Sequence, residues 1–237
     1  MSSATVSAAF KSPPDQASQT SAHISDEFDQ KLISLLPHGD YNLGSNFEWA
    51  TLDDLKGRRI AGAGLNLNWL EGAGIVPVST SLAAAYTDMA TGVFDGFIMF
   101  PSPWFNQKLY EPGPFYTRVG FGAMTQHVLS VNSQTFEELP PEVQTILVEV
   151  AADFQTHVAA IEAQEQTRLI GELEALITVR DIDPAVRQAW AESLQGWVQS
   201  NANELEAAGL PAKEVLNLTL DAAERHGYDW PVRYVIE

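Results

Sequence analysis

A single long run of helical periodicity constrains the fold more than any other feature of the sequence. Apolar residues recur at intervals of three and four, which places them on one face of an α-helix; they are Val143, Ile146, Leu147, Val150, Phe154, Val158 and Ile161. The pattern predicts a helix over residues 140–176, roughly 50 Å long at about 1.5 Å per residue. Such a helix is long for one compact domain, and it indicates a spine that lies across two lobes.

Strands and helices alternate from Leu52 onward. Strands are expected at 58–63, 75–78, 93–100, 115–121, 128–132 and 177–182, and helices at 66–71, 82–91, 102–110, 184–208 and 211–226. This alternation predicts an α/β fold, a mixed sheet flanked by helices. Before it, residues 25–36 have helical spacing, and residues 38–49 are expected to form a loop because Gly and Asn recur there.

The chain is expected to divide into five consecutive segments. Residues 1–24, rich in Ser, Ala, Gln and Thr, predict a disordered leader without the apolar stretch of a secretory signal. Residues 25–50 would be a remnant of a first lobe or a linker, and 51–139 an α/β ligand-binding lobe. The long helix at 140–176 follows, and helices within 177–237 pack across the lobes.

Charge and cysteine content exclude several classes of partner and site. The 237 residues include 31 acidic and 13 basic ones, for a formal net charge of −18. Such a surface repels phosphate backbones and anionic lipid, so no nucleic-acid partner is expected. The absence of cysteine rules out disulfides, thiolate metal sites and a cysteine nucleophile.

No pattern in the sequence points to catalysis. The five histidines are scattered and show no metal-ligand spacing. The Gly62-Ala63-Gly64 turn lacks the third glycine of a dinucleotide-binding loop, because Leu67 stands in its place. We therefore expect neither an enzyme nor a cofactor.

Five stretches, in order, resemble one known family. They are Thr51–Gly62 (TLDDLKGRRIAG), Pro77–Gly96 ending in TGVFDG, Gln107–Glu111 (QKLYE), Val128–Gln144, and the long helix itself. Together they span roughly residues 51–237. The chain resembles the substrate-binding proteins of tripartite ATP-independent periplasmic (TRAP) transporters, the dicarboxylate-binding-protein family.

This resemblance implies a fold, a function and partners. The fold would be periplasmic-binding-protein-like, with a ligand cleft between two α/β lobes, a long bridging helix and here an incomplete first lobe. Lobe closure on a ligand creates a form that membrane partners recognise. The protein would capture a small organic acid in the periplasm for the membrane permease subunits of a TRAP transporter.

Two family positions differ in this sequence, and they shape the expected site. Ala61 stands where the family commonly carries a carboxylate-clamping arginine, and Met99 stands where an asparagine is common. A larger, partly apolar or aromatic acid is therefore expected, held by stacking and a few hydrogen bonds. The candidate ligand-binding residues are Asn66, Asn68, Trp69, Met99, Phe100, Ser102, Trp104 and Arg118. For the aromatic ones, core packing is an equal alternative.

Two other functions stay open. The chain could be a truncated, non-binding remnant or an interaction module of the same fold. This hypothesis of a remnant or interaction module depends on whether residues 23–50 pair as strands to complete the sheet. Their glycines and asparagines disfavour such pairing. A hydrolase or isomerase would need an acid or base with a shifted pKa in the cleft, and none of the candidate residues is one.

Overall fold

The computed structural model describes residues 25, 27–37, 39–122 and 126–237, which form two compact units. Of these residues, unit 1 contains those up to Gly39 and those within Gly122–Gln164 and Asn217–Tyr228, and unit 2 contains Asp40–Phe121, Glu165–Leu216 and Asp229–Glu237. The expected leader, residues 1–24, lies outside the described residues. The division into five consecutive segments stays a prediction.

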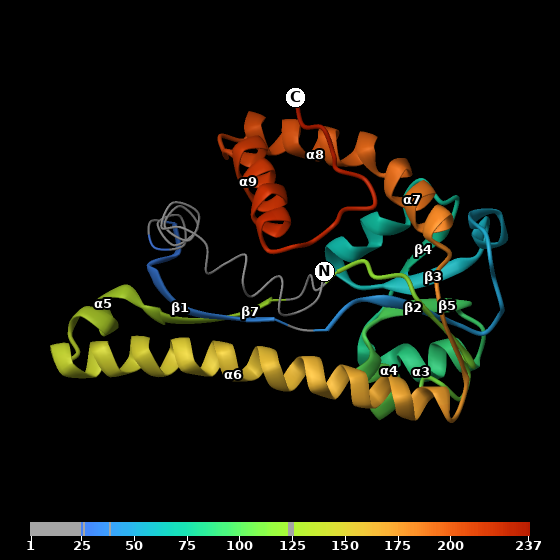
Figure 1. Cartoon of the computed structure of the whole chain (residues 1–237), viewed down its shortest axis with the longest axis horizontal. Helices are drawn as coiled ribbons and strands as arrows, with labels where there is room; N and C mark the ends of the chain where they lie inside the picture. Colours follow the sequence, from blue (N-terminus) through green and yellow to red (C-terminus); the bar gives the residue numbers. More distant parts are fainter. Residues whose placement is uncertain (1–24, 26, 38, 123–125) are drawn as a thin grey trace. The chain divides into compact units, whose positions relative to one another are not determined.

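A six-stranded mixed sheet forms the centre of unit 2, in the order β4-β3-β5-β2-β6-β8 (Figure 1). Its strands are β2 (Asn42–Ser45), β3 (Arg59–Gly62), β4 (Val76–Ser79), β5 (Gly96–Met99), β6 (Phe115–Arg118) and β8 (Thr178–Asp181). Only β2 runs against its neighbours β5 and β6; the other pairs are parallel. The C-terminal ends of the five parallel strands therefore share one edge with the start of β2.

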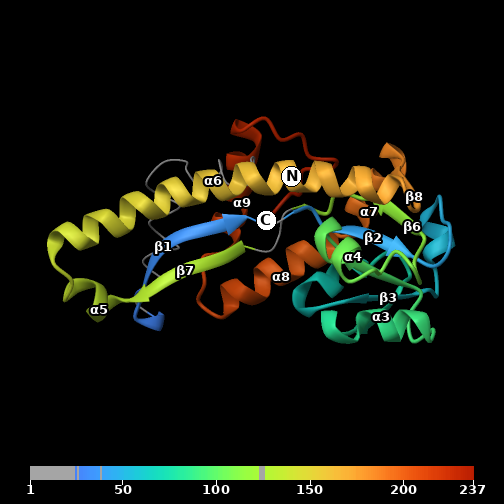
Figure 2. The same cartoon turned by 90° about the horizontal axis from the view of Figure 1, so that it is seen from below.

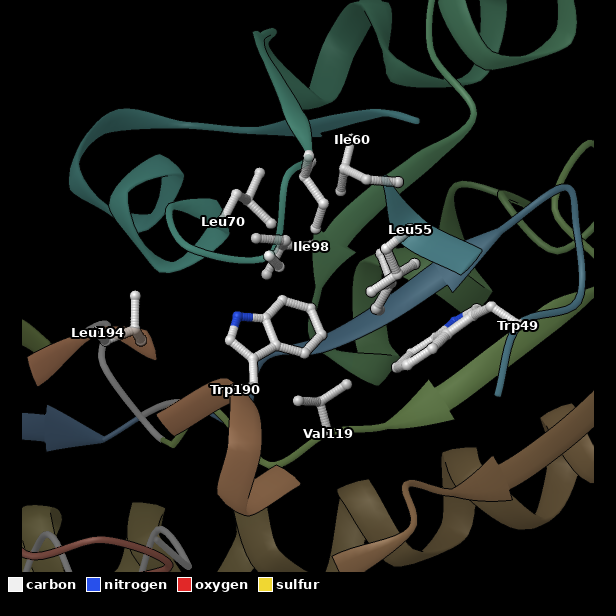
Figure 3. Close-up of a cluster of buried hydrophobic side chains, with 11 residues drawn as sticks. Trp49, Leu55, Ile60, Leu70, Ile98, Val119, Trp190 and Leu194 are labelled. Atoms are coloured by element: carbon white, nitrogen blue, oxygen red, sulfur yellow. The ribbon is translucent and has the colours of Figure 1, made fainter. Parts of the chain in front are cut away.

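Each face of this sheet is covered by a separate apolar cluster, because side chains alternate along every strand. Ile60 and Ile98 point to one face, where Leu70 and Trp190 cover them; Figure 3 shows this cluster around the Trp190 indole. Ala61 and Phe97 point to the other face, packed with residues of α3, α4 and α6. Sheet and helices thus make three layers, as the sequence predicted.

The helices of unit 2 begin close to the expected positions, but the helix expected at 102–110 ends at Asn106, the one expected at 184–208 is divided into two, and the first short helix was not expected. They are η1 (Leu52–Leu55) and η2 (Gly64–Leu70), both 3-10 helices, and α3 (Leu82–Ala90), α4 (Pro101–Asn106), α7 (Pro184–Ser193) and α8 (Gln195–Ala207). Figure 1 shows α7 on one side of the sheet and α3 and α4 on the other. Asp183 caps α7, since its carboxylate accepts a hydrogen bond from the Ala185 N–H at 2.8 Å.

The predicted long helix is present as α6 (Pro141–Glu174), unbroken at Gly171. Its residues up to Gln164 belong to unit 1 and the rest to unit 2. Unit 1 also holds the antiparallel pair of β1 (Gln30–Pro37) and β7 (Gln126–Asn132), α5 (Ser133–Glu137) and most of α9 (Ala212–Arg225). Figure 2 shows β1 and β7 lying along the first part of α6, where the Ser34 hydroxyl donates to the Ala151 carbonyl at 3.4 Å.

The helix expected at residues 25–36 is wrong. One helical turn is present, in which the Asp29 N–H donates to the Ser25 carbonyl at 3.0 Å. Asp29 then adopts a φ of 52°, in the left-handed region, and this ends the turn. The following residues extend as β1, because β7 supplies backbone partners in the register Gln30↔Asn132.

The loop expected at residues 38–49 is also wrong, because it contains β2. Gly44 is required there by packing and not by a turn, since a Cβ would lie 2.2 Å from ring atoms of Trp104. Asn42 ties β2 to the segment that follows β6, because its amide oxygen accepts the Gly120 N–H at 3.0 Å. Parts of residues 23–50 thus do pair as strands, in both units, contrary to what their glycines and asparagines indicated.

Candidate functional site

The shared edge where the parallel strands end carries most of the expected ligand-binding residues. Asn66, Asn68 and Trp69 lie on η2, directly after β3. Met99 ends β5, and Phe100, Ser102 and Trp104 follow it at the start of α4. Arg118 is the last residue of β6. In α/β sheets, ligands bind outside the carboxyl ends of the strands, so the topology favours this edge.

Several of these side chains pack or hydrogen-bond within the protein and do not present a surface to a ligand. Trp104 is fully buried and packs against Tyr116, with ring centroids 5.6 Å apart. Met99 is buried in the same cluster, and its carbonyl accepts the Tyr116 hydroxyl at 2.8 Å. Burial raises the pKa of the Tyr116 phenol, so this donor stays protonated. Asn66 accepts the Ala63 N–H at 2.8 Å and so fixes the start of η2.

Half-buried aromatic rings connect two of the expected segments. Tyr41 makes edge-to-face contacts with both Trp69 and Phe100, at centroid distances of 5.4 and 5.3 Å. Trp69 also stacks on Phe121 at 5.3 Å. Asn68 and Ser102 are half-buried nearby on η2 and α4. Trp69 and Phe100 thus both contact the Tyr41 ring. Tyr41 was not among the expected site residues, because its segment was interpreted as a loop.

A pocket of about 500 Å³ opens at the same edge within unit 2. That volume lies within the range of small-molecule sites. Of the eight candidate residues, Arg118 lines it and the other seven do not. The lining residues are Asp40, Asn42, Pro101, Arg118, Val119, Gly120, Gln166, Thr167, Ile170, Asp181, Ile182 and Arg187.

Arg118 reaches the pocket from the end of β6. In the parallel register it lies beside Asp181 of β8, and its Nη2 donates to the Asp181 carboxylate at 2.7 Å. Its Nε is buried and has no hydrogen-bond partner among the described residues. A buried N–H without a partner is costly, and a ligand oxygen placed there would relieve that cost.

Three further charged residues line the pocket and were not expected from the sequence, namely Asp40, Asp181 and Arg187. Arg187 of α7 donates from Nε to the Val119 carbonyl at 3.0 Å and from Nη2 to the Gly120 carbonyl at 3.1 Å. Burial raises the pKa of the Asp40 carboxyl, and the positive charge of Arg187 opposes the rise. The capping Asp183 was a signal that could have placed Arg187 one turn into a helix; nothing comparable marked Asp40.

The chain matches a family model over residues 15–204, described as bacterial extracellular solute-binding protein, family 7. The chain belongs to this family.

Known relatives agree with this assignment. A solute-binding protein of Sulfitobacter sp. (strain NAS-14.1) is 27% identical over 144 residues, which is 58% of this chain and 42% of that relative. The chain thus spans less than half of that relative's length.

Solved structures show the same fold at low sequence identity. A TRAP periplasmic solute-binding protein from Haemophilus influenzae RdAW with bound L-gulonate has a TM-score of 0.81 at 18% identity, over 93% of this chain and 71% of that one. The periplasmic ectoine-binding protein of a TRAP transporter of Halomonas elongata also has a TM-score of 0.81 at 18% identity, over 94% and 72% of the two chains. The predicted fold class and family are confirmed.

The two family positions with altered residues are both buried. Ala61 and Met99 pack in the cluster with α3 and α4, so neither offers a side chain to the pocket. Within the described residues, no group of three or more His, Asp or Glu side chains is arranged to hold a metal ion. No helix in the same part of the chain is long and apolar enough to cross a bilayer.

Proposed function

We propose that this protein is an extracytoplasmic solute-binding protein that captures a small organic acid and performs no reaction on it. One observation at Arg118 supports the proposal most directly. This side chain lines the pocket at the carboxyl ends of the parallel strands, and its buried Nε has no hydrogen-bond partner among the described residues. Guanidinium groups are the usual partners of carboxylates, because two N–H groups match two oxygens. The structure with bound L-gulonate and the ectoine-binding protein both belong to proteins that bind small organic molecules, which fits this class.

The same proposal includes place and partners. The family is extracellular by its description, and the two solved relatives are periplasmic proteins of TRAP systems. We therefore infer that the chain acts in the periplasm and presents its ligand to the membrane subunits of such a transporter. Trp69, Phe100 and Ser102 remain proposed contacts for an apolar part of the ligand.

An enzyme fits the pocket less well. Asp40 is an acid with a raised pKa, of the kind that a hydrolase would need. However, the lining contains no histidine that could activate the Thr167 hydroxyl as a nucleophile, and the Asp181 carboxylate is paired with Arg118. Asp40 is better explained as a charge that recognises the ligand.

The proposal is tested by calorimetric titration and thermal unfolding against aliphatic and aromatic carboxylates, sugar acids and neutral analogues. A ligand at about a hundred times its dissociation constant adds about 2.7 kcal/mol to the stability. Arg118→Gln should weaken binding at least tenfold, because a hydrogen bond to a charged group is lost. Arg118→Lys should be intermediate, since lysine lacks the paired N–H groups.

Arg59→Gln is the matched control. Arg59 also pairs with an aspartate on a neighbouring segment, Asp95 at 3.2 Å, but at the opposite end of β3 from the pocket. The variant Arg59→Gln should leave the affinity for the ligand unchanged. Unchanged affinity in Arg118→Gln, or no binding by any acid, would contradict the proposal.

A second candidate is an interaction module, and one observation favours it. Four apolar side chains on one face of α6 are 45–60% exposed, namely Ile146, Val150, Phe154 and Ile161. Exposed apolar patches commonly mark surfaces that contact other proteins.

A further inference from the structure

The part of α6 that belongs to unit 1 buries small residues and exposes large apolar ones. Ala151 and Ala159 are buried, and the Gln155 side chain accepts the Ser34 hydroxyl of β1 at 3.3 Å. Figure 1 shows β1 and β7 along this side of the helix. The larger apolar side chains, which are 45–60% exposed, are those of Ile146, Val150, Phe154 and Ile161. Large apolar side chains that stay exposed while alanines are buried indicate a surface for another contact.

The four exposed side chains form a stripe that fits a second helix, and we call it the α6 stripe. They follow one another at intervals of four, four and seven residues, so they lie on one face of the helix. From Ile146 to Ile161 the stripe extends about 22 Å, or about four turns. Amphipathic helices bind through anchors at such spacings, whereas a strand presents side chains at every second residue.

The carboxylates beside the α6 stripe give it a negative charge. Glu142, Glu149 and Asp153 are exposed, and each lies three or four residues from a member of the stripe, which places it beside the stripe. None of the three pairs with a basic side chain among the described residues. The sequence from Pro141 to Gln164 contains no lysine or arginine, and its one histidine is the exposed His157.

This charge distinguishes between the possible partners of the stripe. A second copy of the chain carries the same acids and the same formal net charge of −18, so repulsion opposes its binding. An anionic lipid surface is repelled in the same way. A helix with lysine or arginine beside its own apolar face would pair with the acids, because charges beside an apolar seam set the choice of partner in coiled coils.

We propose that the α6 stripe binds an amphipathic helix of another protein, one that carries basic residues beside its apolar face. The site lies within unit 1 and does not depend on the pocket of unit 2. The inference therefore goes beyond the capture of an organic acid, and it gives the exposed face of α6 a partner of defined chemistry.

Three synthetic peptides of equal length test this proposal on the full chain. The first is an amphipathic helix of leucine and lysine with its leucines at the spacing of the α6 stripe. The second replaces each lysine with glutamate, and the third has the composition of the first in scrambled order. In titrations followed by the fluorescence anisotropy of labelled peptide, the first should bind at least tenfold more tightly than either of the others. The scrambled peptide measures the attraction of any basic peptide to an acidic protein.

Single substitutions locate the contact. Val150→Gln should weaken the binding of the first peptide about tenfold, because it removes one apolar side chain from the interface. Glu149→Gln should weaken it about threefold, as for one exposed ion pair. Leu205→Gln and Glu204→Gln on α8 are the matched controls, because Leu205 is 39% exposed and follows an exposed glutamate. Both controls should leave the affinity for the peptide unchanged.

Several results would overturn the proposal. They are the absence of binding by the first peptide, equally tight binding of the scrambled or the glutamate peptide, and an unchanged affinity in Val150→Gln. Sedimentation velocity of the chain alone tests the competing occupant: a dimer that Val150→Gln dissociates would place a second copy on the stripe and would also overturn the proposal. None of these results changes the outcome of the organic-acid titrations, so the solute-binding function is tested separately.

Discussion

At the scale of single residues, Gly44 of β2 is required because the Trp104 side chain packs directly against it. A Cβ there would lie 2.2 Å from the Trp104 ring, which is fully buried in the core. Gly44→Ala should therefore destabilise the protein by about 2 kcal/mol or more, through overpacking of the core. Denaturant unfolding followed by tryptophan fluorescence measures this change.

Gly171→Ala serves as the control for that substitution. Gly171 lies inside α6 and also belongs to unit 2, and a Cβ there meets no atom within 4 Å. Alanine should raise the stability by about 0.5–1 kcal/mol, because glycine is the poorer helix former. Equal effects at Gly44 and Gly171 would show that Trp104 does not pack against β2.

The expected site residues differ in where the structure places them. Arg118 lines the pocket, and its role as a carboxylate partner stays a prediction. Trp104 was expected beside the ligand with core packing as the alternative, and the structure places it in the core. An aromatic residue near a strand end looks the same in sequence in either case, because its packing depends on residues elsewhere in the chain, here Gly44, Gly113 and Tyr116.

At the scale of elements, α6 presents an apolar face that the described residues leave uncovered. Val150 is 60% exposed in the same helix in which Leu169 is fully buried. Val150→Gln should change the stability by no more than about 0.5 kcal/mol, as for an exposed position. Leu169→Ala should cost about 2–5 kcal/mol, because it leaves a cavity.

A different result at Val150 would identify a covered surface. A loss of about 1 kcal/mol or more in Val150→Gln would mean that the face is buried in the native protein. A midpoint of unfolding that rises with protein concentration would then indicate a second copy as the cover. That outcome would favour the interaction module.

Helices were predictable from the sequence because their contacts are local, and the first two strands were not. The repeat that contains Val143 and Phe154 predicted α6 almost to the residue. In contrast, β1 is fixed by its pairing with β7, about a hundred residues later, and β2 by β5 and β6. The apolar spacing of Phe28, Leu32 and Leu35 fits a helix equally well, so only these long-range pairings decide.

At the scale of the whole molecule, the two units differ in how well their sheets are supported. Among the described residues, unit 2 has six strands with Leu43 and Ile98 fully buried, whereas unit 1 has two strands, with Val128 of β7 51% exposed. Two-stranded pairs are marginal without further packing. Amide hydrogen exchange should therefore be slowest in β2 and β5 and faster in β1 and β7.

Amide hydrogen exchange also shows in which unit a ligand binds. A ligand that binds in the pocket of unit 2 should stabilise unit 2 and leave the stability of unit 1 unchanged. At about a hundred times its dissociation constant it should slow exchange in β6 and β8 about a hundredfold, which corresponds to about 2.7 kcal/mol. Exchange in β1 and β7 should stay as it was, and Arg118→Gln should remove the slowing. Equal slowing in all four strands would instead mean that the ligand contacts unit 1 as well, or that the two units open as one, and the site would then extend beyond the pocket.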